Sequence, residues 1–528
     1  MKKSFNQSFV FLCLAIFCLS LKLSAQAPVI KTQNGQISGY KIGEISIFKG
    51  IPFAAPPVGD LRWKAPQPVK NWTGVLKCEK FSASPVQGDP KPFMMWTEEF
   101  ITPPGNLSED CLYLNVWTPS ITGNEKLPVL VYFYGGGLIA GSGDEFRYAG
   151  ETLARKGIIT ITVNYRLGIF GFFSLPELTK ESPNHTSGNY GYLDQVAALK
   201  WVQTNIAAFG GDPARVTIAG ESAGSISVSA LMCSPISKNL IAGVIGSSGS
   251  LMGALSPIPL GQAEMNGQLT AKNLNIETLA GLRAIPADKL LDAKGQFSPN
   301  IDGYFIPKPP VEIFAKGEQA KVPSLIGWNS LEMNSGYFLK GKSPTLVNFK
   351  DAVNKAFGDT TDLVCNLYQA NDDASAAVAA TDLASDMFIG FSTWKWTDMQ
   401  KKTGGKPVYR YRFCHPRPLM IPALNKAPRA TGAVHSADIE YAMGNLYTNQ
   451  VYEWEAEDFK VSEIFQSYYL NFVKTGNPNG LGVPEWPSIN NQTVPEVLQI
   501  DMDTHVTTDN DLEKRYEFLN SFYFPGKK

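Results

Sequence analysis

"GESAG" at residues 220–224 decides the fold, because it joins a segment typical of a buried strand to a segment typical of a helix. The segment before the turn, ARVTIAG (214–220), is apolar and β-branched, and it predicts a strand. The segment after the turn, SAGSISVSALMCS (222–234), has the spacing of a buried helix. A strand that passes directly into a helix is typical of an α/β fold.

The serine in this turn is a candidate nucleophile. A sharp strand-to-helix turn holds Ser222 clear of its own backbone, and Gly220 and Gly224 leave room for the crowded neighbours. The amide of Ala223, at the start of the helix, is placed to stabilise negative charge that develops beside the serine. The alternative is a glycine-rich turn with an incidental serine.

Other strands and helices follow the same alternation along the chain. Further strands are predicted at ISIFKGIPF (45–53), LYLNVWTP (112–119), LPVLVYFYGGG (127–137), GIITITVNYR (157–166), KVPSLIGWN (321–329) and KPVYRYRFCH (406–415). A long helix is predicted over residues 190–210, and residues 253–401 are mainly helical apart from the strand at 321–329. This pattern predicts an α/β protein with a mostly parallel sheet, helices on both faces and a helical insertion. No linker divides residues 26–528, which we expect to form one domain.

Three consecutive glycines, Gly135, Gly136 and Gly137, follow the apolar strand at 127–137. Such a run is costly unless the backbone must approach another group closely. We predict that the amides of Gly136 and Gly137 stabilise an oxyanion, and a plain turn is the alternative.

Four histidines are available as a general base. His185 precedes Ser222, against the serine, acid, histidine order of this kind of fold, and His505 lies in a polar tail. His415 ends a predicted strand, where a structural role is favoured, and His435 lies in the loop that follows. Chain order leaves both His415 and His435 open.

Composition and the N-terminus exclude several classes of function. The 528 residues carry a formal net charge of −1 without a basic run, so a nucleic-acid partner is not expected. Lys2 and Lys3 precede an apolar run at 9–21 and small residues at Ala25, which is typical of a signal peptide over residues 1–25. The run is too short to span a bilayer, so we expect no membrane anchor. The protein is expected to be exported, periplasmic or secreted, from a bacterium.

Seven cysteines become five when the leader is removed, which leaves at least one free thiol. Cys233, in the helix after the nucleophile, is expected to be a buried free thiol. No Cys-X-X-Cys or His-X-X-X-His spacing occurs, so neither a metal site nor a cofactor is expected.

The chain resembles the type-B carboxylesterases, the cholinesterase-like group of α/β-hydrolases. The resemblance rests on GIPFAAPPVGDLRWKAPQP, SEDCLYLNVWTP, YGGG, VNYRLGIFGFF, GNYGYLDQVAALKWVQTNIAAFGGDPARVTIAGESAG, GSSGS, IDGYFIP, HSADIEYAMGN and WPSIN, in this order. It implies an α/β-hydrolase fold and a serine carboxylesterase that needs no cofactor and hydrolyses small-molecule esters.

The resemblance also assigns residues. It implies Ser222 as nucleophile, His435 as base, and the amides of Gly136, Gly137 and Ala223 as the oxyanion hole. The family's acid segment reads GWNSLEMNSG here, which implies Glu332 as the acid although Leu331 and Met333 replace the family's Asp and Gly. Asp302 and Asp386 are the alternatives for the acid.

Supporting features come from the same resemblance. It implies a Cys78–Cys111 disulfide, support of the triad by Glu221 and Ser248, and two structural ion pairs, Arg62–Glu109 and Arg166–Asp194. The position of the cholinesterases' choline-binding tryptophan is Ile101, and Trp96 is out of register, which argues against a choline ester.

The substrate is left open by the sequence. Phe388, Phe391, Trp394 and Trp396 are candidates for the pocket, with a role in the core as the alternative. Specialisation as a feruloyl, acetyl-xylan or para-nitrobenzyl-type esterase is one alternative. A non-catalytic binding protein on the same fold is another, and the retained serine, acid and histidine argue against it.

Overall fold

The computed structural model describes residues 27–89, 91, 106–253, 255–422, 424 and 428–525. The expected signal peptide, Trp96 and Ile101 lie outside these ranges. No helix among the described residues has the length and apolar character needed to cross a membrane.

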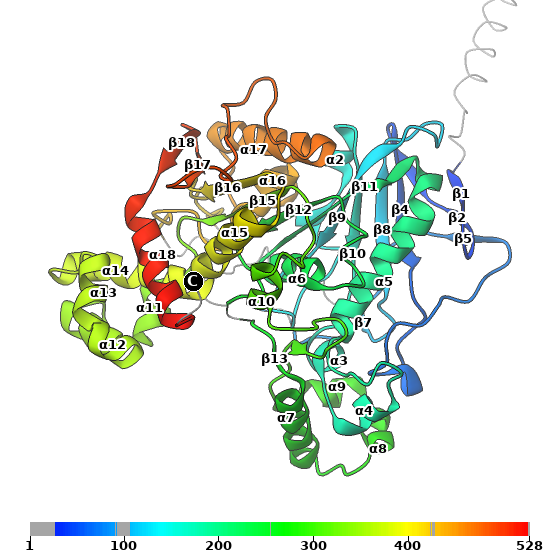
Figure 1. Cartoon of the computed structure of the whole chain (residues 1–528). Helices are drawn as coiled ribbons and strands as arrows, with labels where there is room; N and C mark the ends of the chain where they lie inside the picture. Colours follow the sequence, from blue (N-terminus) through cyan, green and yellow to red (C-terminus); the bar gives the residue numbers. More distant parts are fainter. Residues whose placement is uncertain are drawn as a thin grey trace, which may run out of the picture.

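A sheet of eleven strands, counted among the described residues, forms the centre of the molecule (Figure 1). From one edge to the other the strands are β18 (His505–Thr508), β17 (Glu496–Ile500), β16 (Val408–Phe413), β15 (Ser324–Asn329), β12 (Gly243–Ser247), β11 (Gly211–Glu221), β9 (Leu127–Phe133), β10 (Ile159–Val163), β8 (Tyr113–Thr118), β4 (Ile45–Pro52) and β3 (Tyr40–Ile42). The strands from β17 to β10 run parallel, whereas β18 and β8 join the two edges of this block antiparallel. The mostly parallel sheet is as predicted.

Helices cover both faces of this sheet. One face carries α5 (Tyr190–Asn205), α6 (Ala223–Cys233) and α15 (Phe391–Thr403), and the other carries α2 (Glu151–Arg155) and α17 (Ala456–Thr475), which packs on α16 (Ile439–Met443). Because both faces are covered, the central strands are apolar throughout: β9 is buried except at its first residue, and β10 is buried along its whole length.

The strand β12 was not predicted, and its composition gives the reason. Two of its five residues, Gly243 and Gly246, are glycines, which weaken strand propensity. A Cβ on Gly246 would lie 2.2 Å from the Trp396 ring, so the close packing of α15 against the sheet requires glycine there. The sequence analysis also missed β3, β17 and β18.

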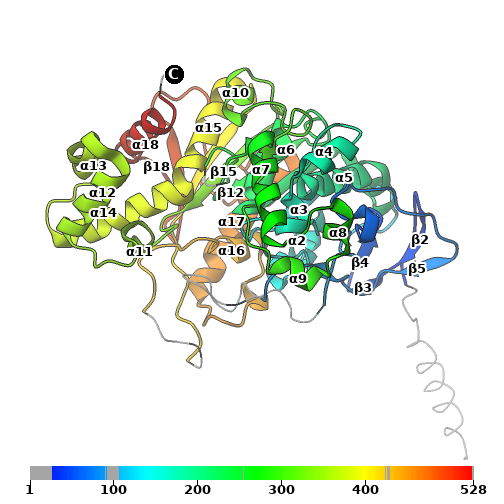
Figure 2. The same cartoon turned by 90° about the horizontal axis from the view of Figure 1, so that it is seen from below.

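The mainly helical stretch 253–401 lies largely outside the sheet. After β15 the chain forms α11 (Ser335–Leu339), α12 (Leu346–Phe357), α13 (Thr361–Leu367) and α14 (Asp373–Ser385). Together with α18 (Asn510–Tyr523) these helices bury a separate apolar cluster that includes Trp328, Met333 and Phe349. Both views place α11–α14 at the end of the molecule opposite β2 (Gly35–Ser38) and β5 (Val75–Lys77) (Figures 1 and 2).

Both expected ion pairs are formed; Arg166–Asp194 is buried and Arg62–Glu109 is partly buried. Arg166 donates to both carboxylate oxygens of Asp194 at 2.7 and 2.8 Å, and Arg62 pairs with Glu109 at 2.5 Å between Nη2 and Oε1. Such pairs hold loops in place, since removal of either partner would leave an unpaired buried charge.

The expected disulfide is not formed. Cys78 and Cys111 are both buried free thiols. The amide of Cys78 donates to the Ser38 carbonyl of β2 at 2.7 Å, and its carbonyl accepts from the Lys49 amide of β4 at 2.8 Å. Cys111, in contrast, lines a small cavity together with Pro85 and Val86. The pairing was carried over from the family, and here Pro85 rather than Cys78 lies at the cavity beside Cys111. Cys233 is buried and free, as predicted.

Candidate active site

Ser222 occupies the predicted turn between β11 and α6. Its backbone is left-handed, with φ 55° and ψ −122°, which is rare for a residue with a side chain. A Cβ on Gly224 would lie 2.0 Å from the Phe133 carbonyl oxygen, and a Cβ on Gly220 would lie 2.4 Å from the backbone of Gly224. The turn therefore exists only with glycine at both positions. It is held to β12 by a 2.9 Å hydrogen bond from the Ser222 amide to the Ser247 carbonyl.

Three side chains from distant segments form one hydrogen-bonded chain. Nε2 of His435 lies 2.9 Å from Oγ of Ser222, and Nδ1 of His435 lies 2.5 Å from Oε2 of Glu332. His435 and Glu332 are 1% and 0% exposed, whereas Ser222 is only partly buried. Of these three residues, Ser222 is therefore the one that a substrate in solution can reach.

The carboxylate of Glu332 is fixed by two further donors. Its Oε1 accepts hydrogen bonds of 2.6 Å from the Ser248 hydroxyl and of 2.6 Å from the Asn329 amide. The Asn329 side chain donates in turn to the Ser248 hydroxyl at 3.3 Å. Both carboxylate oxygens of Glu332 thus form hydrogen bonds: one with the His435 imidazole, and the other with Ser248 and with the backbone of the loop that carries Glu332.

The two departures from the family pattern beside Glu332 have local explanations. Leu331 forms a parallel backbone bridge with Val434, and its amide donates to the Ala433 carbonyl at 2.8 Å. The backbone, not the side chain at 331, therefore aligns the acid loop with the histidine loop. Met333 is buried in the cluster under α11–α14, where an apolar side chain fills space that glycine would leave empty.

The rival acids lie elsewhere. Asp302 closes its own turn, accepting three hydrogen bonds from the amides of residues 304–306. Asp386 is buried beside Arg515 and accepts a 2.8 Å hydrogen bond from the Tyr368 hydroxyl. Both carboxylates have structural partners at these positions.

The rival base is also engaged elsewhere. His415 is held between two carboxylates, with Nε2 3.0 Å from Asp458 and Nδ1 2.8 Å from Asp501. Neither ring nitrogen is directed at Ser222. His185 and His505 are exposed.

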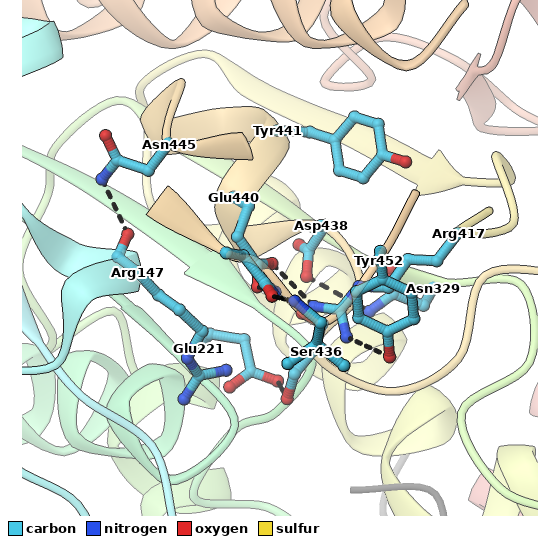
Figure 3. Close-up of polar contacts among 12 residues, drawn as sticks. Arg147, Glu221, Asn329, Arg417, Ser436, Asp438, Glu440, Tyr441, Asn445 and Tyr452 are labelled. Atoms are coloured by element: carbon cyan, nitrogen blue, oxygen red, sulfur yellow. Dashed lines mark hydrogen bonds and ion pairs between the residues drawn. The ribbon is translucent and has the colours of Figure 1, made fainter. Parts of the chain in front are cut away.

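A second carboxylate lies beside the histidine. Oε1 of Glu221 is 3.3 Å from Nε2 of His435 and accepts a 2.5 Å hydrogen bond from the Ser436 hydroxyl, which Figure 3 shows. Burial raises the pKa of Glu221 to about 7, although the neighbouring imidazole opposes this shift. Burial alone would lower the pKa of His435, but Glu221 and Glu332 outweigh it and raise this pKa to about 9. The two carboxylates therefore stabilise the imidazolium that forms when His435 takes a proton.

Arg417, which lies outside the motifs quoted above, anchors the loop that carries His435. Nη2 of Arg417 donates to the Ser436 carbonyl at 3.0 Å and to Glu440 at 2.6 Å (Figure 3). Tyr452 stacks under its guanidinium at 5.1 Å. Sequence reasoning missed Arg417 and Ser436. Ser436 could have been found from its place next to His435, whereas nothing in the sequence marks Arg417.

The glycine run predicted to bind an oxyanion packs directly against the nucleophile. A Cβ on Gly135 would lie 3.2 Å from Cβ of Ser222, and Gly136 and Gly137 have φ values of 98° and 65°. Gly136 is also crowded, since a Cβ there would lie 2.3 Å from the Ala140 carbonyl oxygen. The run thus provides the close backbone approach that the sequence analysis inferred.

Of the four candidate pocket aromatics, only Phe388 contacts the triad. Its ring meets His435 edge-on, with 5.1 Å between the ring centroids. The other three are core residues: Phe391 and Trp394 belong to the cluster under α11–α14, and Trp396 is packed against β12. Phe391 and Trp394 pack against Tyr516 of α18, whereas the Trp396 ring packs against the sheet.

Within the described ranges, no group of three His, Cys, Asp or Glu side chains is arranged to hold a metal ion.

The chain was compared with known proteins. The profile of the Carboxylesterase family matches residues 26–519. The chain is 35% identical to a fumonisin B1 esterase of Sphingopyxis macrogoltabida, with 86% of this chain and 83% of that protein covered. It is also 35% identical to a medium-chain fatty acyl-CoA hydrolase precursor of Anas platyrhynchos, with 88% and 87% covered. A solved PNB esterase structure superposes with a TM-score of 0.78 at 30% identity, covering 93% of this chain and 99% of that chain.

Proposed function

Since the chain belongs to the carboxylesterase family and is a carboxylic ester hydrolase with the α/β-hydrolase fold, we propose that it acts through an acyl-enzyme on Ser222. The observation that carries this proposal is the continuous hydrogen-bonded chain from Ser222 through His435 to Glu332. Ser222 is the one serine in the turn 220–224, and it is partly exposed.

In the first half of the reaction, Oγ of Ser222 attacks the ester carbonyl carbon while Nε2 of His435 takes its proton. Glu332 orients the imidazole through Nδ1 and stabilises the imidazolium that forms. The carbonyl oxygen becomes an oxyanion, for which the amides of Gly136, Gly137 and Ala223 are the donors. Collapse of this intermediate expels the alcohol, which takes the proton from His435.

In the second half, a water molecule takes the place of the serine. His435 removes a proton from the water as its oxygen attacks the acyl carbonyl, and the same amides stabilise the second oxyanion. The Ser222–acyl bond then breaks, Ser222 recovers its proton, and the carboxylic acid leaves. This sequence requires only the residues of the site, an ester and water.

The substrate is a small-molecule carboxylic ester of the general class that carboxylesterases hydrolyse. The relatives' names give different substrates, namely fumonisin B1, a medium-chain fatty acyl-CoA and PNB. A PNB-type specialisation is the second candidate, and it is favoured by the superposition over 93% of the chain.

The protein is exported, and the mature chain begins at residue 26. The leader pattern supports this location, as does the start of the family match at residue 26, directly after the expected cleavage site. Cell fractionation and N-terminal sequencing of the purified protein test it, and a cytoplasmic enzyme that retains Lys2 and Lys3 would contradict it.

The test of the chemistry is covalent labelling. An organophosphate should modify Ser222 alone and abolish ester hydrolysis with one equivalent bound. Peptide mapping by mass spectrometry locates the adduct. An adduct on another residue, with activity lost in step, would overturn the assignment of the nucleophile.

A further inference from the structure

A cavity of about 540 Å³ lies beside α11 and α12, outside the hydrogen-bonded triad. Its volume is in the range of small-molecule sites. The apolar part of its lining includes Tyr337, Phe338, Leu339 and Met387. The polar part is dominated by three lysines, Lys340, Lys342 and Lys355. Apolar walls combined with one sign of charge suit an amphipathic anion.

The three lysines are exposed and available. Within the part of the chain that the structure describes, none of their ammonium groups forms an ion pair or hydrogen bond. The full chain has a formal net charge of −1, so this concentration of positive charge is a local feature rather than a general one. Clustered cations around a hollow raise the local concentration of anions.

Aromatic contacts connect this cavity to the catalytic histidine. Tyr337, which lines the cavity, meets Phe388 edge-on with 5.9 Å between ring centroids. Phe388 then meets His435 with 5.1 Å between ring centroids. Met387, next to Phe388 in the chain, also lines the cavity. One ring, that of Phe388, therefore separates the triad from the cavity wall.

We infer that this cavity is a subsite for the anionic end of an ester substrate, so that the enzyme favours esters that carry a carboxylate at a distance from the scissile bond. The lysines bind the carboxylate, and the apolar walls bind the chain that links it to the ester. This inference rests on the proposed function, since the subsite serves the same Ser222.

The test uses pairs of esters that differ only in charge. One series is the nitrophenyl hemiesters of dicarboxylic acids from succinic to sebacic acid, each paired with its methyl-capped, neutral counterpart. A second series carries the carboxylate on the alcohol side, as acetates of hydroxycarboxylic acids of increasing length, again with methyl-capped partners. The ratio of kcat/KM within each pair measures the preference for the anion.

The variant is the triple substitution Lys340→Gln, Lys342→Gln and Lys355→Gln, and the matched control is Lys350→Gln. Lys350 lies on the same helix α12 and is exposed, but it does not line the cavity. In one of the two series, the wild-type enzyme should have a higher kcat/KM for the anionic ester than for its neutral partner once the carbon chain of the ester is long enough. In the triple variant this kcat/KM ratio should be about tenfold lower than in the wild type, because exposed charge contacts are individually weak and three act together. Hydrolysis of the neutral partners should be unchanged.

An equal preference in the wild type and the triple variant would overturn the inference, and so would an equal loss in the Lys350→Gln control. Absence of any preference for the anion in both series would also overturn it. Failure of the proposed function has a different signature, namely hydrolysis of the neutral esters that survives Ser222→Ala.

Discussion

The carboxylate of Glu221 lies 3.3 Å from the nitrogen of His435 that faces the nucleophile. Its charge favours the imidazolium, whereas a general base must be neutral before it can accept a proton. Replacing Glu221 by Gln should therefore lower the pKa of His435 and move the acidic limb of the kcat/KM profile to lower pH. Ester hydrolysis measured across the pH range checks the shift, and an acidic limb that stays in place in Glu221→Gln would contradict it. Ser436→Ala removes a hydrogen bond that lowers the pKa of Glu221, so it should move the limb in the same direction by a smaller amount.

Ser222 and His435 should behave as one catalytic unit. Ser222→Ala and His435→Ala should each lower kcat by on the order of 10⁴-fold or more, and the double variant should cost little more than either alone. Steady-state kinetics on a nitrophenyl ester gives the three values. Losses that multiply in the double variant would show that the two residues act independently.

Glu332→Gln should lower kcat by about 10²- to 10⁴-fold with little change in KM, because the amide fills the same space without the charge that stabilises the imidazolium. Asp302→Asn and Asp386→Asn should keep kcat, since both carboxylates have structural partners of their own. Kinetics and melting curves of the three variants separate the roles. Loss of kcat in an Asp302 or Asp386 variant that melts normally would identify another acid.

His415 should contribute to stability rather than to catalysis. Burial opposes its charge, but the hydrogen bonds that its ring donates to Asp458 and Asp501 outweigh this effect and raise the pKa of His415 above its ordinary value of 6.5. The charged pairs therefore stabilise the fold fully below about pH 6.5, and this contribution is lost as the pH rises through the folded-state pKa. Urea unfolding at a series of pH values should show the decline in wild type and a flatter profile in His415→Gln.

The same His415→Gln variant should cost about 3 kcal/mol near pH 6, because the Asp458 carboxylate is left buried without its cation. Its kcat on a neutral ester should be close to that of the wild type. A large loss of kcat in a stably folded variant would give His415 a part in the chemistry.

Cys78 and Cys111 should be recovered as separate thiols. Burial raises the pKa of the Cys78 thiol to about 12, and it raises that of Cys111 still further, so both should react slowly with iodoacetamide while the protein is folded. Both should be alkylated after unfolding without a reducing agent. A linked peptide in a non-reducing digest would show that the two are bridged after all.

Local features of the site could be predicted and distant ones could not. The turn at Ser222 follows from five adjacent residues, so its sequence is sufficient. The choice between His415 and His435 depends on which loop returns to the carboxyl ends of β11 and β15, and chain order alone does not contain that information. The contact of Glu221 with Ser436 joins positions 215 residues apart.

The fold shows the same division. Strands with continuous β-branched residues, such as β9 and β10, were predicted, whereas the glycine-containing β12 was missed. Gly246 in β12 is required by the nearby Trp396 ring, and this contact cannot be inferred from the local sequence. The disulfide prediction was wrong: Cys78 and Cys111 are both free thiols, and Cys111 lines a cavity to which Cys78 does not contribute. The pairing was carried over from the family and did not follow from the packing of this chain.

The backbone bridge between Leu331 and Val434 has an evolutionary consequence. Because main-chain atoms keep the acid loop and the histidine loop in register, the side chain at 331 is free to drift without loss of the acid. Gly224, whose missing Cβ is essential to the turn, has no such freedom. A saturation library at position 331 should therefore yield many active clones with altered properties, and a library at position 224 should yield almost none.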